Sequence, residues 1–308
     1  MRICALVNAE GGTVRRNGGV DTERERLTAA FAGRDNLQAE LVFTTGDKLA
    51  EHADRALNRA RRGELDAVVA GGGDGSISAV AGVLVGTEVP LGILPLGTMN
   101  HFAKDLGVPT DLDGAVAMIA AGEIRQVDVG QVNGHVFLNN SSIGLYPRMV
   151  LDRDRQIDEA GRGKRVAKLL ALLRALRRFP RRRLAIRAEG VAAHCTTPCV
   201  FIGNNEYRFG VLELGTREHL DAGELCVYVA RPNGAVGLVL LAFRAAFGGL
   251  EQASDFHMFR AKVAEIGSRA SRLPVSLDGE VKMLRPPLRY RIRSGALRVI
   301  GPSPASAA

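Results

Sequence analysis

Short apolar runs alternate with helical stretches through the first 125 residues of this 308-residue chain, and this alternation limits the possible folds more than any other feature. The apolar runs read RICALVN, AELVFTT, LDAVVAGGGDGS and PLGILPLGT, and the helical stretches cover residues 21–32, 47–62, 77–85 and 111–121. Strands that alternate with helices at this spacing form a parallel sheet with helices on both faces. We therefore predict an α/β domain with a parallel sheet over residues 1–125.

The pattern changes after about Gly122, where apolar and polar residues begin to alternate in short runs. An Asn-Gly pair at Asn133 and Gly134 is a strong hairpin signal. These features predict a mainly antiparallel β-sandwich domain over residues 126–300, with two helical interruptions, the basic segment described below and residues 234–250. The C-terminal end of this domain could pack back on the first domain, and residues 301–308 are expected to be a disordered tail.

The cysteines and the apolar segments indicate the cellular compartment. Among four cysteines only Cys195 and Cys199 lie close together, and no second Cys or His pair at zinc-ligand spacing accompanies them. We interpret all four as reduced thiols of a cytoplasmic protein, with no disulfide framework and no zinc site. The N-terminal apolar run is too short for a signal peptide, and residues 235–243 are too few to span a bilayer.

Positive charge is concentrated in one segment. The net charge is +8, but residues 161–187 carry eleven Lys or Arg and no acid, so the rest of the chain carries 8 − 11 = −3. Apolar residues recur there at helical spacing: Val166, Leu169, Leu170, Leu173 and Leu176. A basic amphipathic helix binds anionic membranes, at about 1 kcal/mol per basic residue.

We therefore expect peripheral contact with an anionic membrane through residues 162–183. The alternative is that the leucines pack on the β domain and the charges are only solvated. Nucleic-acid binding is not expected, because Phe179 is the one aromatic residue of the segment.

The run AGGGDGSISAV at residues 70–80 joins a predicted strand to a predicted helix. Such a turn either reverses the chain tightly or directs backbone N–H groups at an anion. It lacks the Gly-Lys-Ser/Thr ending of a P-loop and the GxGxxG spacing of a dinucleotide fold, which disfavours both classes. Asp74 would repel a phosphate directly but suits a magnesium ion that bridges to one.

Two further runs carry polar side chains in informative positions. In LGILPLGTMNHFAKDLG, Thr98 and Asn100 follow a strand, at the edge where open α/β sheets bind ligands. In VSLDGEVK, Asp278 and Gly279 form a common hairpin turn, and Glu280 alone would be interpreted as a solvated strand residue.

Together these runs resemble the diacylglycerol kinase catalytic family, in its bacterial lipid kinase branch. The matching pieces are VNAEGG, GGGDGS, LGILPLGTMNHFA, VDVGQVNGHVFLNNSSIGL and SLDGE, which extend over nearly the whole chain. NAD kinases share the Gly-Gly-Asp-Gly turn and the fold, but not the LGILPLGTMNHFA run.

The resemblance implies roles for particular residues. Glu280 matches the general base that takes the proton from the lipid hydroxyl, and Asp74 matches a catalytic position that binds magnesium. The implied nucleotide-binding residues are Asn8, Thr44 or Thr45, Gly71, Gly72, Gly73, Gly75, Ser76, Thr98 and Asn100. Phosphoryl transfer needs positioning, charge neutralisation and a proton acceptor, so we expect the active site between the two domains.

The chain departs from the family pattern in two places. The family's Asp-Gly-x-Leu magnesium site is replaced by LDAGELCV, where Asp221 and Glu224 are the remaining candidate metal ligands. A glycine-rich stretch is replaced by GNNEYRFGVLELGTREHL, which could alter the lipid that is accepted.

These observations predict an ATP- and Mg²⁺-dependent lipid kinase of phospholipid metabolism and lipid biosynthesis. It would act on diacylglycerol or a related lipid alcohol, as a cytoplasmic protein at the inner membrane face, and a homodimer is compatible with the sequence. The alternatives are a sphingoid-base or other lipid kinase, an NAD kinase-like enzyme, and a non-catalytic nucleotide-binding regulator.

Overall fold

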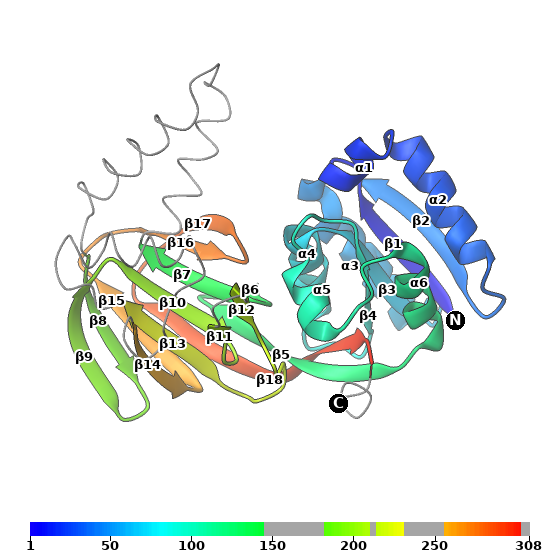
Figure 1. Cartoon of the computed structure of the whole chain (residues 1–308). Coiled ribbons are helices and arrows are strands. Elements are labelled where there is room, and N and C mark those ends of the chain that lie inside the picture. The colour runs from blue at the N-terminus through cyan, green and yellow to red at the C-terminus, as the bar shows by residue number, and fades with distance from the viewer. Residues whose placement is uncertain (145–181, 210–213, 231–255, 303–308) are drawn as a thin grey trace, which may run out of the picture. The chain divides into compact units, whose positions relative to one another are not determined.

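The computed structural model describes residues 1–144, 182–209, 214–230 and 256–302, and the chain forms two compact units (Figure 1). The first unit holds Met1–Val129, Leu220–Ala222 and Arg293–Ala308, and the second holds Gly130–His219 and Gly223–Ile292. The chain thus first passes between units at Val129, and the domain boundary expected from the sequence lies four residues earlier, at 125.

The first unit is built on a parallel sheet in the order β2-β1-β3-β4, followed by the end of β18. The strands are β1 (Arg2–Asn8), β2 (Gln38–Thr44), β3 (Ala67–Gly72), β4 (Leu91–Pro95) and β18 (Leu288–Ile300). Strands β3 and β4 are buried along their whole length, which explains their continuous apolar sequences. The predicted α/β class of this domain is confirmed.

Helices follow these strands as the apolar spacing predicts. They are α1 (Gly12–Arg16), α2 (Val20–Ala32), the short 3-10 helix η1 (Gly46–Lys48), α3 (Leu49–Arg61), α4 (Asp74–Leu84), α5 (His101–Leu106) and α6 (Leu112–Ala121). Helix α3 packs with α4, and α2 packs with α6. Helix α4 begins three residues before the predicted residue 77, because Gly73 is its N-cap and the polar end of the turn is already helical.

The second unit contains two largely antiparallel sheets. One has the order β18-β15-β8-β9, with β5 and β6 beside it, and the other has the order β14-β13-β10-β7-β16-β17. The strands are β5 (Ile124–Val132), β6 (His135–Phe137), β7 (Asn140–Gly144), β8 (Arg182–Ala188), β9 (Val191–Thr197), β10 (Cys199–Asn204), β13 (Leu225–Ala230), β14 (Phe256–Ala261), β15 (Val263–Ser268), β16 (Leu273–Leu277) and β17 (Glu280–Leu284). The short strands β11 (Arg208–Phe209) and β12 (Leu214–Thr216) pair separately.

One hydrophobic core joins the two sheets of the second unit. Ile143 and Ile202 come from one sheet, and Ile186, Ile266 and Leu288 come from the other. The predicted hairpin turn is present, with positive φ at Asn133 (45°) and Gly134 (89°). The predicted β-sandwich class of the C-terminal domain is confirmed.

The chain ends in the first unit. Gly301 is buried, and its N–H donates to the carbonyl of Glu123 at 3.0 Å. The predicted tail therefore includes two described residues, Gly301 and Pro302, while residues 303–308 lie outside the described part. Residues 162–181, which carry most of the predicted membrane-binding segment, and the predicted helix at 234–250 also lie outside it.

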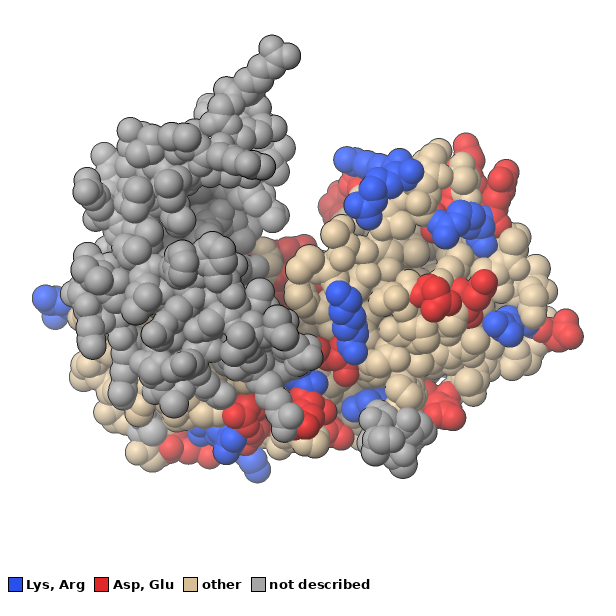
Figure 2. Space-filling view, in the orientation of Figure 1, with Lys and Arg blue, Asp and Glu red and all other residues tan. Residues whose placement is uncertain are grey.

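Surface charge on the described residues is mixed in sign. Figure 2 shows Lys and Arg interspersed with Asp and Glu on the visible face of the first unit. This mixture agrees with the low net charge of the chain outside residues 161–187. No helix within the described ranges is long and apolar enough to cross a membrane.

The four cysteines are free thiols. Burial raises the pKa of the Cys4 thiol to about 11. Burial, with the nearby Glu224 carboxylate, raises the pKa of the Cys226 thiol to about 12. Both groups are therefore protonated at neutral pH, the unreactive state of a thiol.

Candidate active site

The carboxyl edge of the parallel sheet gathers several of the predicted nucleotide-binding residues. Asn8 ends β1 in register with Thr44 at the end of β2, and Gly72 ends β3 in register with Pro95 of β4. The side chain of Thr44 is buried, and Thr45 is the N-cap residue of η1. Ligands of open α/β sheets bind outside this edge.

The glycine turn after β3 is packed closely against the end of β1. The side-chain amide of Asn8 donates to Ser76 Oγ at 2.9 Å, and Asn8 Oδ1 accepts the N–H of Glu10 at 3.0 Å. A Cβ on Gly72 would lie 2.6 Å from Ser76 Oγ, so a larger residue does not fit there. Asn8 and Ser76 thus form one hydrogen-bonded pair beneath the turn.

The loop after β4 is in direct backbone contact with that turn. A Cβ on Gly97 would collide with Gly73 Cα and would lie 2.5 Å from Asn100 Oδ1. The two motifs therefore form one structure in which their backbones touch. We call residues 71–76 and 96–100 the paired glycine loops. Glycine is required where the two backbones meet.

Asn100 shapes its own loop. It adopts a positive φ of 51°, and its Oδ1 accepts the N–H of Gly97 at 3.0 Å. Its side-chain amide donates to the carbonyls of Pro95 and Gly97, both at 3.0 Å. The resemblance assigns the Asn100 side chain to nucleotide binding, but in the structure these three hydrogen bonds hold it within its own loop. By contrast, the neighbouring Thr98 is exposed to solvent.

Asp74 links the two loops through its carboxylate. Its oxygens accept the N–H groups of His101 at 3.2 Å and of Phe102 at 3.1 Å, which begin α5. Each oxygen accepts one of these bonds and keeps a further lone pair. The carboxylate therefore fits a magnesium ion or one of its bound waters, because Mg²⁺ prefers oxygen ligands and retains several waters.

Glu280 lies in the second unit, on a hairpin whose turn is held by hydrogen bonds between a side chain and distant backbone. Asp278 (φ 48°) and Gly279 (φ 93°) form the turn between β16 and β17, and Glu280 is exposed. The Asp278 carboxylate accepts three successive backbone N–H groups: Leu138 at 2.7 Å, Asn139 at 2.8 Å and Asn140 at 3.1 Å.

A buried polar cluster holds the other side of residues 138–140. Arg217, which is 4% exposed, donates to the carbonyls of Leu138 (2.7 Å) and Asn204 (3.1 Å) and to Asn139 Oδ1 (2.7 Å). The side-chain amide of Asn204 also donates to the Leu138 carbonyl, at 2.8 Å. Sequence reasoning missed Arg217 and the role of Asp278, although the polar run NNSS within a buried strand was a usable signal.

Glu224, one of the two candidate ligands of a second metal site, has other partners in the structure. Glu224 forms an ion pair with Arg260 at 3.1 Å and accepts a weak hydrogen bond from the Cys226 thiol. Asp221 is exposed, and the described residues contain no group of three His, Cys, Asp or Glu that could hold a metal. The assignment of Asp221 and Glu224 to magnesium stays a prediction, as does the expectation of a site between the domains.

Two family models cover most of the chain. Residues 2–132 match the diacylglycerol kinase catalytic domain, and residues 155–301 match the YegS C-terminal NAD kinase beta sandwich-like domain. The order of the two matches agrees with the order of the two units, an α/β unit followed by a β-rich unit.

Two curated relatives match over more than four fifths of their own length. A protein described as "Probable lipid kinase YegS-like" from Pseudomonas fluorescens is 30% identical over 285 residues, which cover 90% of this chain and 89% of the relative. One with the same description from Pseudomonas syringae pv. tomato is 31% identical, covering 85% and 83%. A solved structure described as a diacylglycerol kinase from Bacillus anthracis str. Sterne superimposes with a TM-score of 0.67 over 99% of this chain and 97% of that one. Its identity is 22%, so this likeness concerns the fold.

Proposed function

This chain belongs to the diacylglycerol kinase catalytic family with a YegS-type C-terminal domain, and we propose that it transfers the γ-phosphate of ATP to the hydroxyl of diacylglycerol or a related lipid alcohol. The observation that carries the proposal is the contact of the paired glycine loops at the carboxyl edge of the sheet. The first N–H groups of a helix have no acceptor within it, so those at the start of α4 suit phosphate oxygens.

The residues of the first unit bind and orient the nucleotide in this proposal. The backbone of the glycine turn, together with Thr98, contacts the phosphates, and the pair Asn8–Ser76 holds the turn against β1. Asp74 would hold magnesium through the lone pairs that remain after its two backbone hydrogen bonds. The bound ion would neutralise charge on the phosphate oxygens.

Glu280 supplies the proton acceptor. As the lipid hydroxyl oxygen forms its bond to the γ-phosphorus, the bond from that phosphorus to the ADP oxygen breaks, and the hydroxyl proton moves to the Glu280 carboxylate. The three hydrogen bonds to Asp278 hold the hairpin turn that carries Glu280. Exposure of the Glu280 side chain agrees with a group that must meet a substrate.

The relatives support the proposed acceptor, and the charge distribution supports the proposed location. Both Pseudomonas relatives are described as probable lipid kinases, which supports a lipid alcohol as acceptor. The basic segment 162–183 supports peripheral contact with an anionic membrane at the cytoplasmic face. An enzyme that phosphorylates a membrane lipid must meet its substrate at such a surface.

The proposal is tested with labelled ATP, Mg²⁺ and vesicles that contain a diacylglycerol, a sphingoid base or neither, with NAD in a parallel reaction. We expect label in the diacylglycerol. Glu280→Gln should lower turnover by about 10²–10⁴-fold, the usual contribution of a general base, while ATP binding is unchanged.

Glu189→Gln is the matched control, because Glu189 is also exposed at a hairpin turn of the second unit and loses the same charge. Undiminished turnover in Glu280→Gln would overturn the base assignment. Label only in the sphingoid base, or only in NADP, would overturn the acceptor, and binding of ATP without label in any acceptor would favour a regulator.

A further inference from the structure

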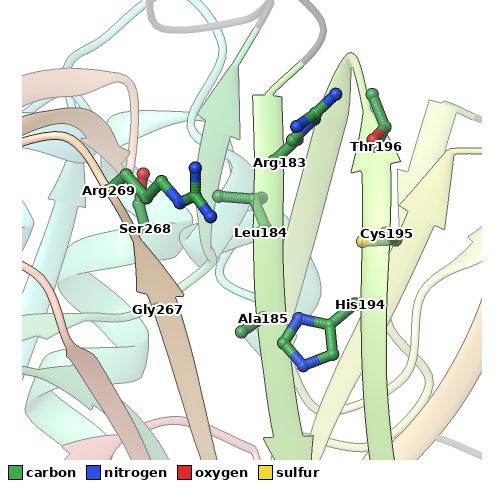
Figure 3. Close-up of a pocket in the computed structure, with 9 residues that line it drawn as sticks. All are labelled: Arg183, Leu184, Ala185, His194, Cys195, Thr196, Gly267, Ser268 and Arg269. Carbon is green, nitrogen blue, oxygen red and sulfur yellow. The ribbon is translucent and has the colours of Figure 1, made fainter.

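The second unit has a hollow on one of its sheets, and the residues that line it do not include the Glu280 hairpin. Its volume is about 350 Å³, within the range of small-ligand sites (Figure 3). It is lined by residues of β8, β9 and the end of β15: Arg183, Leu184, Ala185, His194, Cys195, Thr196, Gly267, Ser268 and Arg269. None of these residues belongs to the kinase machinery proposed above.

Small residues in the middle of the three strands create the hollow. Ala185 pairs with His194 on one side and with Gly267 on the other. A Cβ on Gly267 would meet Ala185 Cβ at 3.6 Å, an ordinary contact, so a side chain can start there without a clash. In Figure 3, His194 and Ala185 project from neighbouring strands on the same side.

Positively charged side chains border the hollow. Arg183 pairs across β8 and β9 with Thr196, Arg269 follows the end of β15, and both arginines are exposed. Neither guanidinium has a hydrogen bond or ion pair within the described part of the chain, and no acid lines the hollow. The nearest acid along β15, Glu265, is already paired with Arg289 at 3.2 Å.

We propose that this hollow binds the phosphate group of an anionic phospholipid headgroup. Guanidinium groups form paired hydrogen bonds with phosphate oxygens, and Arg183 and Arg269 present two of them without a competing carboxylate. Ala185 and Gly267 offer carbon surface for the glycerol stem of a lipid, which a free phosphate would not use, whereas the side chain of Leu184 is buried in the core of the unit.

The place of Arg183 in the sequence also favours a membrane lipid. It is the last residue of the basic segment 162–183, which we propose contacts the membrane. The inference rests on the proposed function only in placing the protein at a lipid surface. It adds a site that recognises a lipid which is not phosphorylated in the reaction.

The test uses the full chain without ATP and measures sedimentation with phosphatidylcholine vesicles, with or without 20 mole per cent (about one lipid in five) phosphatidic acid. Arg183→Gln with Arg269→Gln removes both guanidinium groups. Arg187→Gln with Arg272→Gln is the matched control, because both residues are exposed, lie in the same unit and do not line the hollow. Gly267→Leu fills the hollow without changing the charge.

We expect the Arg183/Arg269 variant to bind the acidic vesicles about tenfold more weakly than the Arg187/Arg272 variant, and Gly267→Leu to weaken binding by a similar factor. Circular dichroism must show that each variant is folded. Equal losses in the two arginine variants, or full binding by Gly267→Leu, would overturn the site and leave only general electrostatic attraction.

Soluble glycerol 3-phosphate, measured by calorimetry, distinguishes the source of the phosphate. Binding of this compound as tight as that of the vesicles, and lost in the Arg183/Arg269 variant, would overturn the lipid assignment. Turnover on a short-chain diacylglycerol in detergent micelles is measured separately, so a failed kinase proposal and a failed lipid site give different results.

Discussion

At the scale of single residues, Asp278 shows why a hairpin that is readily predicted can carry a function. Its backbone adopts the positive φ that a two-residue turn requires, which Asp tolerates better than most residues. Its carboxylate then accepts three backbone N–H groups of residues 138–140, about 140 residues away along the chain. One residue therefore shapes the turn and also anchors it.

Removing this anchor should destabilise the second unit. Asp278→Ala leaves three partly buried N–H groups without their acceptor, and we expect a loss of about 1–3 kcal/mol in the free energy of unfolding. Turnover should also fall, because the turn that carries Glu280 loses its anchor. Urea denaturation followed by circular dichroism measures the stability.

The control for this prediction is Asp35→Ala, an exposed aspartate in the first unit. It also removes an aspartate carboxylate, but it breaks none of the three hydrogen bonds that Asp278 accepts. Equal stability of the Asp278 and Asp35 variants would show that residues 138–140 are held by the Arg217 cluster alone.

At the scale of elements, two strand-to-helix connections act as one structure. Strands β3 and β4 are neighbours, so the turns that follow them meet at the carboxyl edge, where Gly73 and Gly97 touch. Asp74 begins one helix and caps the next, so α4 and α5 are fixed relative to each other. Any change that separates the loops should alter both helix starts.

Gly97→Ala tests this coupling. Its Cβ would collide with the backbone of Gly73, and overpacking of this kind costs about 1–3 kcal/mol. We expect both lower stability and weaker binding of a non-hydrolysable ATP analogue, measured by calorimetry. In the control Gly33→Ala, the nearest atom to the new Cβ is 3.9 Å away, so ATP binding should be unchanged. Unaltered ATP affinity in Gly97→Ala would separate the loop contact from nucleotide binding.

At the scale of the whole molecule, the order of residues in the chain differs from their order in space. The first unit takes its last strand segment from the C-terminal end, where Val299 of β18 pairs with Leu91 of β4. Leu297, Val299 and Ile300 of this segment are each at most 2% exposed. An N-terminal fragment that ends near residue 125 therefore lacks part of its own core.

Truncation after Ile292 should unfold the first unit. Losing three buried apolar side chains removes about 1.5–3 kcal/mol each, which approaches the whole stability of a typical domain. Hydrogen exchange should show fast exchange at β1, β3 and β4 of the truncated chain. Deletion of residues 303–308 alone is the control, and slow exchange at these strands in the longer truncation would contradict the prediction.

Much of the fold could be predicted because its signals are local. Alternation of apolar runs with helical spacing identifies the parallel sheet, since both periods depend on residues a few positions apart. The turns at Asn133–Gly134 and Asp278–Gly279 are equally local, because positive φ is a property of single residues. The same local reasoning predicts Thr98 and Asn100 at the edge of the sheet, because they follow a strand.

The long-range contacts of the candidate site were decided by the tertiary structure. The sequence by itself determined the two fold classes and the residue types at the sheet edge. It did not indicate that Gly73 and Gly97 touch, that Asp74 caps a helix 27 residues away, or that Arg217 binds residues 138 and 139. The physical reason is that a buried donor or acceptor must find a partner wherever the fold places one, and no local period records that distance along the chain.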